Sequence, residues 1–267
     1  MLQEVKKKTR LLFVLVCCML ALPVTYAQHT NPAPMNAEEN SVINIKKNFL
    51  KLNLTSLVLK NYSLQYERVL SKTFSVAAAY RTMPSGTIPF KNAVIEELGD
   101  DTEAKNAIER LRMSNTAFTP EVRIYLGKGH GKGFYIAPFY RYSKYTINNI
   151  TFDYSNTAGN ESSIDMSGTF SSHTGGLLFG AQWLLGKHMC LDWSILGPHY
   201  GKGNGLIKGT TTVPLTPAEQ SDLRTELEDL DIPLADKTVN VNANGASLML
   251  DGPWGGVRAS ISLGIRF

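Results

Sequence analysis

Cysteine is scarce in this sequence, with three residues in 267, and two of these, Cys17 and Cys18, lie in the apolar stretch close to the N-terminus. This scarcity excludes a scaffold that depends on disulfides, because such chains contain several times more cysteine. Removal of the N-terminal segment would leave Cys190 as the single thiol. Neither an intramolecular disulfide nor a cysteine metal cluster could then form.

The sequence also lacks a strong excess of charge of one sign. Lys and Arg number 27 and Asp and Glu number 23, which gives a formal net charge of +4. Without residues 1–27 the chain keeps 23 basic and 22 acidic residues, so its net charge falls to +1. Because a nucleic-acid-binding domain presents a concentrated basic surface, we expect no nucleic-acid partner. The 25 aromatic residues and the 19% of charged residues exclude a disordered chain.

Long hydrophobic runs are absent after residue 27, since no segment there contains 18 unbroken apolar residues. This excludes a helical membrane protein, in which each span needs about 20 apolar residues. Residues 1–27 have the layout of a secretory signal peptide, with a basic start, an apolar run over 11–22 and small residues before a cleavage site near Ala27. A membrane-anchor helix is the alternative, but the run is too short to span. A lipoprotein signal is disfavoured because Cys17 follows Val16, which is not a small residue.

Residues 28–47 are polar and contain two prolines, which predicts a flexible periplasmic leader ahead of the folded part of the chain. From residue 48 onward, apolar and polar residues alternate with a period of two, the pattern of strands with two different faces. In the first segment, Leu50 and Leu52 take one face and Lys51 and Asn53 take the other. The pattern predicts eight strands, at 49–58, 62–70, 73–83, 116–126, 133–147, 168–185, 188–196 and 257–267.

The connections between these strands alternate in length. Those at 71–72, 127–132 and 186–187 are short, whereas those at 84–115, 148–167 and 197–254 are long, and the first connection, near 60–61, is the exception. Outer-membrane barrels have short periplasmic turns and long external loops. We therefore expect an all-β protein in which 48–267 form an eight-stranded antiparallel up-and-down transmembrane β-barrel with both chain ends on the short-turn side.

Aromatic side chains share the apolar face and gather toward the strand ends, as the interface girdles of membrane barrels do. They are Tyr62, Tyr66, Tyr80, Tyr140, Tyr142, Trp183 and Trp193. The alternative is the ordinary core of a soluble barrel of the lipocalin type. In that case the apolar face would point inward around a ligand.

Four stretches of the sequence together resemble a family of small outer-membrane β-barrel proteins of Gram-negative bacteria that have no assigned activity. They are NLTSLVLKNYSLQYERVLSKTFSV (53–76), LDWSILGPHYG (191–201), LTPAEQSDLRTELEDLDIP (215–233) and DGPWGGVRASISLGIRF (251–267). The resemblance covers most of residues 48–267. It implies an OmpA/OmpX-like eight-stranded barrel with both termini in the periplasm, and it implies that Phe267 acts as the signal read by the barrel-assembly machinery.

The polar face of the predicted strands carries many charges. Eight strands enclose an interior that side chains just fill, so we expect a plugged lumen without a pore. Because unpaired buried charges are costly, Glu67, Glu121 and Asp192 should each contact a base, and the surplus of bases should lie near the ends. The predicted lumen network is Lys51, Glu67, Arg81, Glu121, Arg123, Arg141, Asp192, Arg258 and Arg266.

No catalytic, cofactor-binding or metal-binding pattern stands out. None of the five histidines is followed by a serine two residues later, the spacing typical of lipid-acting barrel enzymes. No acidic loop has the calcium-binding pattern. The stretch 127–133, rich in Gly and Lys, lacks the order of a phosphate-binding loop and indicates a hairpin turn. We therefore expect no enzyme, no cofactor and no metal.

Two of the long loops carry helical signals. Thr216, Pro217 and Glu219 form a capping box that predicts a helix at 217–230. Residues 92–112 indicate a second helical stretch, interrupted at Gly99. We expect these helices to pack on the barrel rim. The alternative is that they bind a surface partner through the loops 84–115 and 197–254.

The sequence thus predicts a protein of the cell outer membrane with a structural or surface-interaction role. Its partners would be outer-membrane lipid and the barrel-assembly machinery. Two alternatives remain open: a binding module that holds a lipid or apolar ligand at the barrel rim, and a lipid-modifying barrel enzyme.

Overall fold

The computed structural model describes residues 46–88, 90–97, 102–127, 129–155, 161–211, 213–230 and 235–267, which fall within one compact unit. The predicted signal peptide and all but the last two residues of the predicted leader lie outside the described residues. In chain order the elements are β1 (Asn48–Asn53), α2 (Leu54–Val58), β2 (Tyr62–Val69), β3 (Phe74–Gly86), α3 (Lys91–Glu97), α4 (Thr102–Arg110), β4 (Arg112–Tyr125), β5 (Gly133–Ser155), β6 (Glu161–Leu185), β7 (Met189–Thr210), α5 (Pro217–Asp229), β8 (Asp236–Asn242) and β9 (Gly245–Arg266).

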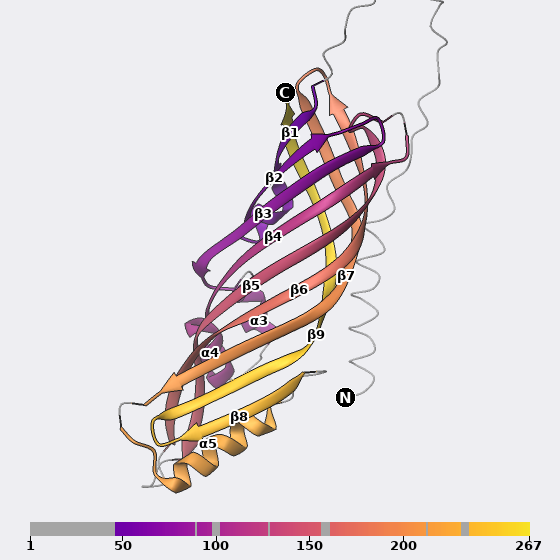
Figure 1. Cartoon of the computed structure of the whole chain (residues 1–267). Helices are drawn as coiled ribbons and strands as arrows, with labels where there is room; N and C mark the ends of the chain where they lie inside the picture. The colour runs from indigo at the N-terminus through magenta and orange to yellow at the C-terminus, as the bar shows by residue number, and fades with distance from the viewer. Residues whose placement is uncertain are drawn as a thin grey trace, which may run out of the picture. The chain divides into compact units, whose positions relative to one another are not determined.

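The strands form one antiparallel sheet of nine strands, eight of which close into a hydrogen-bonded ring (Figure 1). The order is β1 to β7 and then β9, and β9 returns to β1 through pairs such as Leu52 with Leu263. The ninth strand, β8, pairs with β9 over residues 245–251, on the edge that β1 occupies over 262–266. The sequence predicted eight strands and therefore missed β8, which lies inside the predicted loop 197–254.

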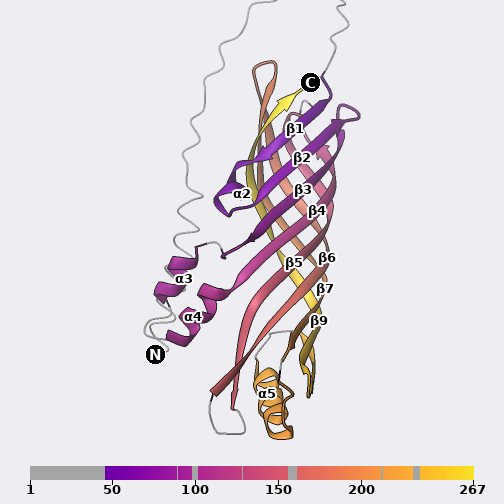
Figure 2. The ribbon, with the colours of Figure 1, turned by 90° about the vertical axis from the view of Figure 1, so that its left-hand side faces the viewer.

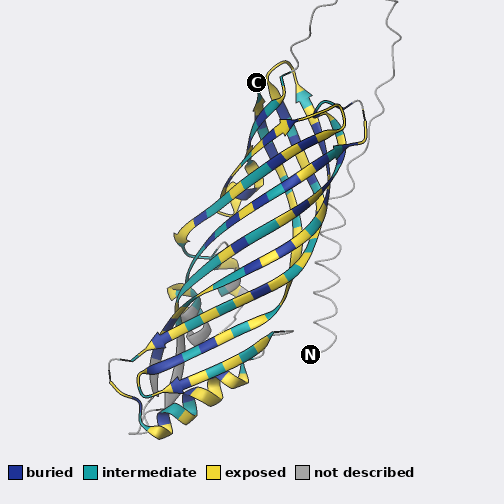
Figure 3. Ribbon diagram, in the orientation of Figure 1, coloured by how far each residue is buried: buried dark blue, intermediate teal, exposed yellow. Residues whose placement is uncertain are grey.

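Buried and exposed residues alternate along the ring strands, as the banding in Figure 3 shows. In β1, Lys51 is 1% exposed whereas its neighbour Leu52 is 40% exposed. In β4, Glu121 and Arg123 are buried and Val122 between them is exposed. Charged and other polar side chains therefore lie in the interior of the ring, together with apolar ones such as Phe139 and Leu178, and large apolar side chains cover its outer face.

The short turns lie at the same end of the ring as the C-terminus and the start of β1 (Figure 1). The amide of His130, in the β4–β5 turn, donates to the carbonyl of Lys72, in the β2–β3 turn, at 2.8 Å. Gly129 permits this approach, because a Cβ there would lie 2.0 Å from the Lys72 oxygen and its φ is +72°. The amide of Asn48 donates to the carbonyl of Phe267 at 3.0 Å.

At the end of the ring opposite the short turns, the strands extend further than the sequence predicted. Residues 148–167 were assigned to a loop, but β5 continues to Ser155 and β6 begins at Glu161, with Ile150 opposite Met166. Likewise β7 continues to Thr210 and β9 begins at Gly245, so both ends of the predicted loop 197–254 are strand. The loop 84–115 is shortened at both ends in the same way, by β3 and β4. Backbone pairing continues because it does not require alternating side chains.

The first predicted strand, 49–58, is too long at its C-terminal end. β1 ends at Asn53, whose side-chain Oδ1 accepts a hydrogen bond from the amide of Ser56 at 3.0 Å. This is an N-cap, and it starts the short helix α2. Leu54 and Val58 are therefore helical residues at the β1–β2 connection and do not continue the outward face of a strand (Figure 2).

The helix α5 begins at the predicted capping box. Thr216 accepts from the amide of Glu219 at 3.4 Å, and the Glu219 carboxylate accepts from the amide of Thr216 at 2.8 Å. Leu223 and Leu227 are fully buried against residues of β6, β8 and β9 at the end of the longer strands (Figure 2). The predicted stretch 92–112 contains α3 and α4. No helix among the described residues is long and apolar enough to cross a membrane.

Replacement of Leu223 by Ala should loosen α5. The side chain is fully buried, and loss of a buried leucine costs about 2–5 kcal/mol. We expect faster hydrogen exchange of the α5 amides, measured by mass spectrometry. Glu226→Ala, a change at an exposed position of the same helix, is the control. Equal exchange in the two variants would contradict the packing described.

Candidate functional site

An ion-pair network of six side chains crosses the interior of the ring; we call it the central network. Its members come from β1, β2, β4, β7 and β9, so that strands distant in sequence are tied together. Asp192 lies at its centre, with Oδ2 2.6 Å from Nζ of Lys51 and 2.5 Å from Nη1 of Arg123. The members are Lys51, Glu67, Glu121, Arg123, Asp192 and Arg258.

The other two acids of the central network also contact bases. Glu67 Oε2 lies 2.5 Å from Nζ of Lys51 and 3.2 Å from Nη1 of Arg123. Glu121 contacts Arg123 at 2.7 Å and Arg258 at 3.1 Å. The network therefore contains three acids and three bases, and its formal charges balance.

Neutral side chains complete the hydrogen bonds of the central network. Tyr135 donates to Oδ1 of Asp192 at 2.7 Å, and Tyr125 donates to Oε1 of Glu67 at 2.6 Å. The amide oxygen of Gln182 accepts from Lys51, and its Nε2 donates to the carbonyl of Gly131 at 2.7 Å. Such additional bonds are needed for buried ion pairs, since Coulombic attraction alone does not offset desolvation.

Sequence reasoning missed these neutral partners. It placed Tyr135 and Gln182 on the polar face, but it gave them no role in the network. Gln65, on the same face, accepts from Arg123 at 2.9 Å and donates to Glu121 at 3.0 Å. The available signal was a large polar side chain on the inward face of a predicted strand.

Three predicted members lie apart from the central network. Arg266 is at the end with the termini, where Nε donates to the carbonyl of Lys46 at 2.8 Å. Arg81 donates to Oδ1 of Asn115 at 2.7 Å, and Arg141 Nε donates to Oγ of Ser143 at 3.1 Å. Within the described part of the chain, no carboxylate lies within ion-pair distance of these three arginines.

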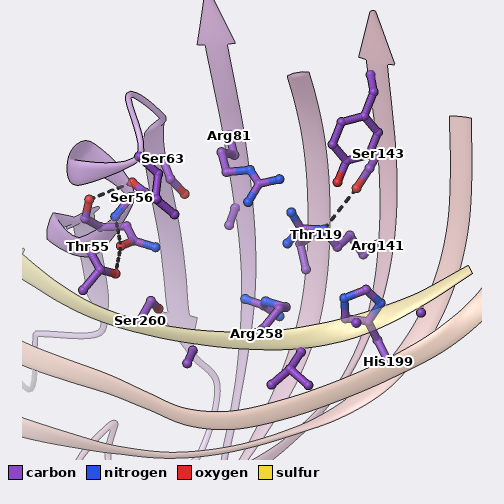
Figure 4. Close-up of a pocket in the computed structure, with 18 of the residues that line it drawn as sticks. Thr55, Ser56, Ser63, Arg81, Thr119, Arg141, Ser143, His199, Arg258 and Ser260 are labelled. Carbon is purple, nitrogen blue, oxygen red and sulfur yellow. Dashed lines mark hydrogen bonds between the residues drawn. The ribbon is translucent and has the colours of Figure 1, made fainter. Parts of the chain in front are cut away.

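Arg81 and Arg141 line a cavity of about 360 Å³, which we call the arginine pocket. Arg258 and His199 also line it, and Figure 4 shows these four side chains pointing toward one shared space from β3, β5, β7 and β9. Its remaining lining residues include hydroxyl groups but no Asp or Glu. The pocket thus combines concentrated positive charge with hydrogen-bond donors.

A second cavity, of about 380 Å³, adjoins the arginine pocket, and we call it the aromatic pocket. The two cavities share Tyr145 and Trp254 as lining residues. The ring centroids of Phe170 and Trp254 lie 4.6 Å apart. A Cβ at Gly203 would lie 2.3 Å from the Phe170 ring, so only glycine leaves room for this aromatic side chain. The lining also includes Met113, Ile147, Ile207, Leu250 and Asp251.

The inward face of β9 explains why the two cavities adjoin. Arg258, Trp254 and Leu250 lie four residues apart on the same face of this strand. A strand rises about 3.3 Å per residue, so charged, aromatic and aliphatic groups follow one another along the interior. Gly256, between Arg258 and Trp254, leaves space for the His199 ring.

His199 was among the five histidines examined in the sequence, where no catalytic spacing was found. In the structure its ring packs edge-on to Phe139 at 6.0 Å between centroids. Within the described residues no group of three His, Cys, Asp or Glu side chains is placed to hold a metal ion. The groups of the arginine pocket are suited to binding an anion.

The fold and site define an antiparallel ring protein with a charged interior and an apolar exterior. The chain belongs to the DUF3575 family, whose description is "Protein of unknown function" and whose sequence profile matches residues 14–202. The match includes β1 to β6 and the first part of β7. No curated protein and no solved structure matches the chain.

Replacement of Asp192 by Ala should strongly destabilise the ring. The change leaves Lys51 and Arg123 without their shared carboxylate, and removal of one partner of a buried ion pair costs about 3–5 kcal/mol. We expect a lower midpoint of urea unfolding, measured by tryptophan fluorescence.

Asp229→Ala, the same change at an exposed position of α5, is the matched control and should leave the midpoint unchanged. If the two variants unfold at the same urea concentration, the central network does not stabilise the ring.

Proposed function

We propose that the ring is an eight-stranded transmembrane β-barrel of the cell outer membrane with a structural or surface-interaction role. The observation that carries this proposal is the continuous cover of exposed apolar side chains around the outside of all eight ring strands. Representatives from β1 to β7 and β9 are Leu52, Leu64, Val76, Val122, Phe134, Leu177, Trp193 and Ile261. Soluble monomers rarely expose apolar patches larger than a few hundred Å², whereas a lipid-facing surface requires such a cover.

The closed ring supports this location. In hydrocarbon no water can satisfy free backbone groups, so a spanning sheet must have no open edge. The pairing of β1 with β9 removes the edges over residues 262–266 of β9, at the end of the ring that contains the short turns. A soluble protein would instead place its apolar side chains inside and its charges outside.

One row of aromatic side chains supports a membrane–water interface at a defined level of the ring. Tyr80 is opposite Phe118, Phe118 is opposite Tyr142, and Tyr142 is opposite His173, on four neighbouring strands. Aromatic girdles mark both interfaces of membrane barrels. On β5, the segment 134–142 runs from the short turn to this row. Its length matches the roughly 9–11 residues that a transmembrane β-strand needs.

The outward residues become polar beyond the aromatic row. On β5, Lys144 follows Tyr142 on the outer face, and on β7 the exposed Lys202 lies opposite His173. The longer parts of β5, β6, β7 and β9, together with β8 and α5, would then project into water outside the cell. This surface, including the connection that holds α3 and α4, is where we place contact with other molecules.

The side-chain contacts across the interior support a barrel without a pore. The central network joins strands across the ring, and its neutral partners add hydrogen bonds at that level. The terminal Phe267 is exposed and follows a strand with an alternating apolar face, which fits the proposed contact with the barrel-assembly machinery. Cleavage near Ala27 would precede insertion.

Ligand binding is a second candidate function, and the adjoining arginine and aromatic pockets favour it. They provide a concave interior site in which three arginines lie next to three aromatic side chains, and small-molecule sites likewise combine aromatic walls with placed polar groups. This function is compatible with the proposed location.

Replacement of Ile261 by Arg tests the lipid-facing surface. Ile261 is exposed on the outward face of β9, in the part of the strand that we place in the membrane, and a charge there costs up to about 2–4 kcal/mol. We expect less protein in the outer-membrane fraction and loss of the heat-modifiable band on gels run with and without boiling.

Met249→Arg is the matched control, because Met249 is exposed on the projecting part of the same strand. It should assemble as the wild type does. A folded, water-soluble Ile261→Arg variant would refute the membrane proposal.

A further inference from the structure

Two groups of charges lie inside the ring. Those of the central network balance, whereas those of the arginine pocket do not. Glu121 connects the two, because it contacts Arg123 in the central network and Arg258 at the wall of the arginine pocket. The three acids of the central network contact Lys51, Arg123 and Arg258, and Arg81 and Arg141 then add two positive charges. Within the described chain no carboxylate balances these two. Charges withdrawn from water are stable only when they are paired or bound.

The donors of the arginine pocket are arranged to receive an oxyanion. Nε of Arg81 and Nδ1 of His199 are buried and have no hydrogen-bond partner among the residues that the structure describes. Arg141 donates from Nε to Ser143, and its guanidinium group lines the same cavity. Guanidinium groups bind carboxylate and phosphate in a two-pronged geometry, and two of them can hold one oxyanion. The absence of acids from the lining disfavours a cation.

The aromatic pocket defines the rest of the ligand. Its shared wall, Tyr145 and Trp254, places apolar surface next to the guanidinium groups. Phe170 and Trp254 provide flat faces, and aliphatic side chains from β4, β5, β7 and β9 line much of the remainder, which also includes Thr169 and Asp251. A ligand that fills both cavities must therefore have an anionic end and an apolar end.

We propose that the interior of the ring binds a small amphipathic anion, a carboxylate or phosphate that carries an aliphatic or aromatic tail. Its oxyanion lies against Arg81, Arg141 and His199, and its tail lies against Phe170 and Trp254. This site goes beyond the structural role proposed above, and it rests on the second candidate function, ligand binding, whose ligand class it specifies. It depends on the interior of the ring and not on the lipid-facing surface, so the two proposals can fail separately.

The test uses the fluorescence of Trp254 in the full chain, purified in a nonionic detergent. The chain has three tryptophans, and Trp183 and Trp193 are on the outer face, where apolar molecules in the micelle also reach them. The variant Trp183→Phe/Trp193→Phe leaves Trp254 as the reporter. Bromine quenches tryptophan on contact, so 8-bromooctanoate and 1-bromooctane serve as probes with and without the anionic head.

We expect saturable quenching by 8-bromooctanoate and none by 1-bromooctane at the same concentration. Octyl phosphate should displace the acid, and inorganic phosphate should displace it only weakly. Arg141→Gln in this background should weaken binding by at least about tenfold, because it removes a charged hydrogen-bond donor. Arg68→Gln, the same change at an exposed arginine of β2, should leave the affinity unchanged.

Several results would overturn the proposal. Equal quenching by the acid and by bromooctane in the reporter chain would show that the head group is not recognised. No quenching by the acid would show that the cavities do not accept this class of ligand. These two results use no arginine variant, so they hold even if Arg141→Gln fails to fold. Unchanged affinity in a folded Arg141→Gln variant would remove the arginine pocket from the site.

Discussion

Asp192 holds Lys51 and Arg123 through one carboxylate oxygen, at 2.6 Å and 2.5 Å, and the rest of the interior is arranged around this contact. The three residues belong to β7, β1 and β4, so the ion pairs tie together strands on different sides of the ring. A buried carboxylate is tolerated only with such partners, since its desolvation costs more than one ion pair returns. The charged interior in turn requires the apolar side chains to face outward. The orientation of the strands that carry these charges therefore follows from this cluster.

The interior changes character along the ring, and this sequence of layers relates the structure to function. The central network fills the part nearer the short turns, the arginine pocket follows, and the aromatic pocket adjoins it. Beyond these cavities, the apolar face of α5 packs on the projecting strands through Leu223 and Leu227. The layers thus separate the central network, in which the formal charges balance, from the two pockets, which contain hydrogen-bond donors without partners among the described residues and unfilled volume. A structural role uses the central network, and ligand binding would use the pockets.

Alternation in the sequence is sufficient to assign faces, but it does not give levels along the ring. The sequence places Lys51, Glu121 and Asp192 on the polar face, and all three are buried in the interior. Which charge meets which depends on strand tilt and register, so the separation of Arg81 and Arg141 from every acid was not predictable. The strand β8 could have been predicted from the sequence. Val239 and Val241 alternate with polar residues before an Asn-Gly pair at 244–245, which is a hairpin signal. The extension of β5 and β6 beyond the predicted strands could not have been predicted. The residues in these extensions do not alternate clearly between apolar and polar, and they pair through the backbone.

Spin labels along β5 test the orientation of the ring most directly. A nitroxide is attached at Phe134, Ile136, Tyr140 or Lys144, one position at a time, in protein inserted into lipid vesicles. Each label reports collisions with oxygen and with a water-soluble nickel chelate. The native thiol of Cys190 is fully buried, so it should not take up the label. The first three positions should be accessible to oxygen and protected from nickel, and Lys144, beyond the aromatic row, should be accessible to nickel. Nickel access at Ile136 and Tyr140 equal to that at Lys144 would contradict an apolar face turned toward lipid.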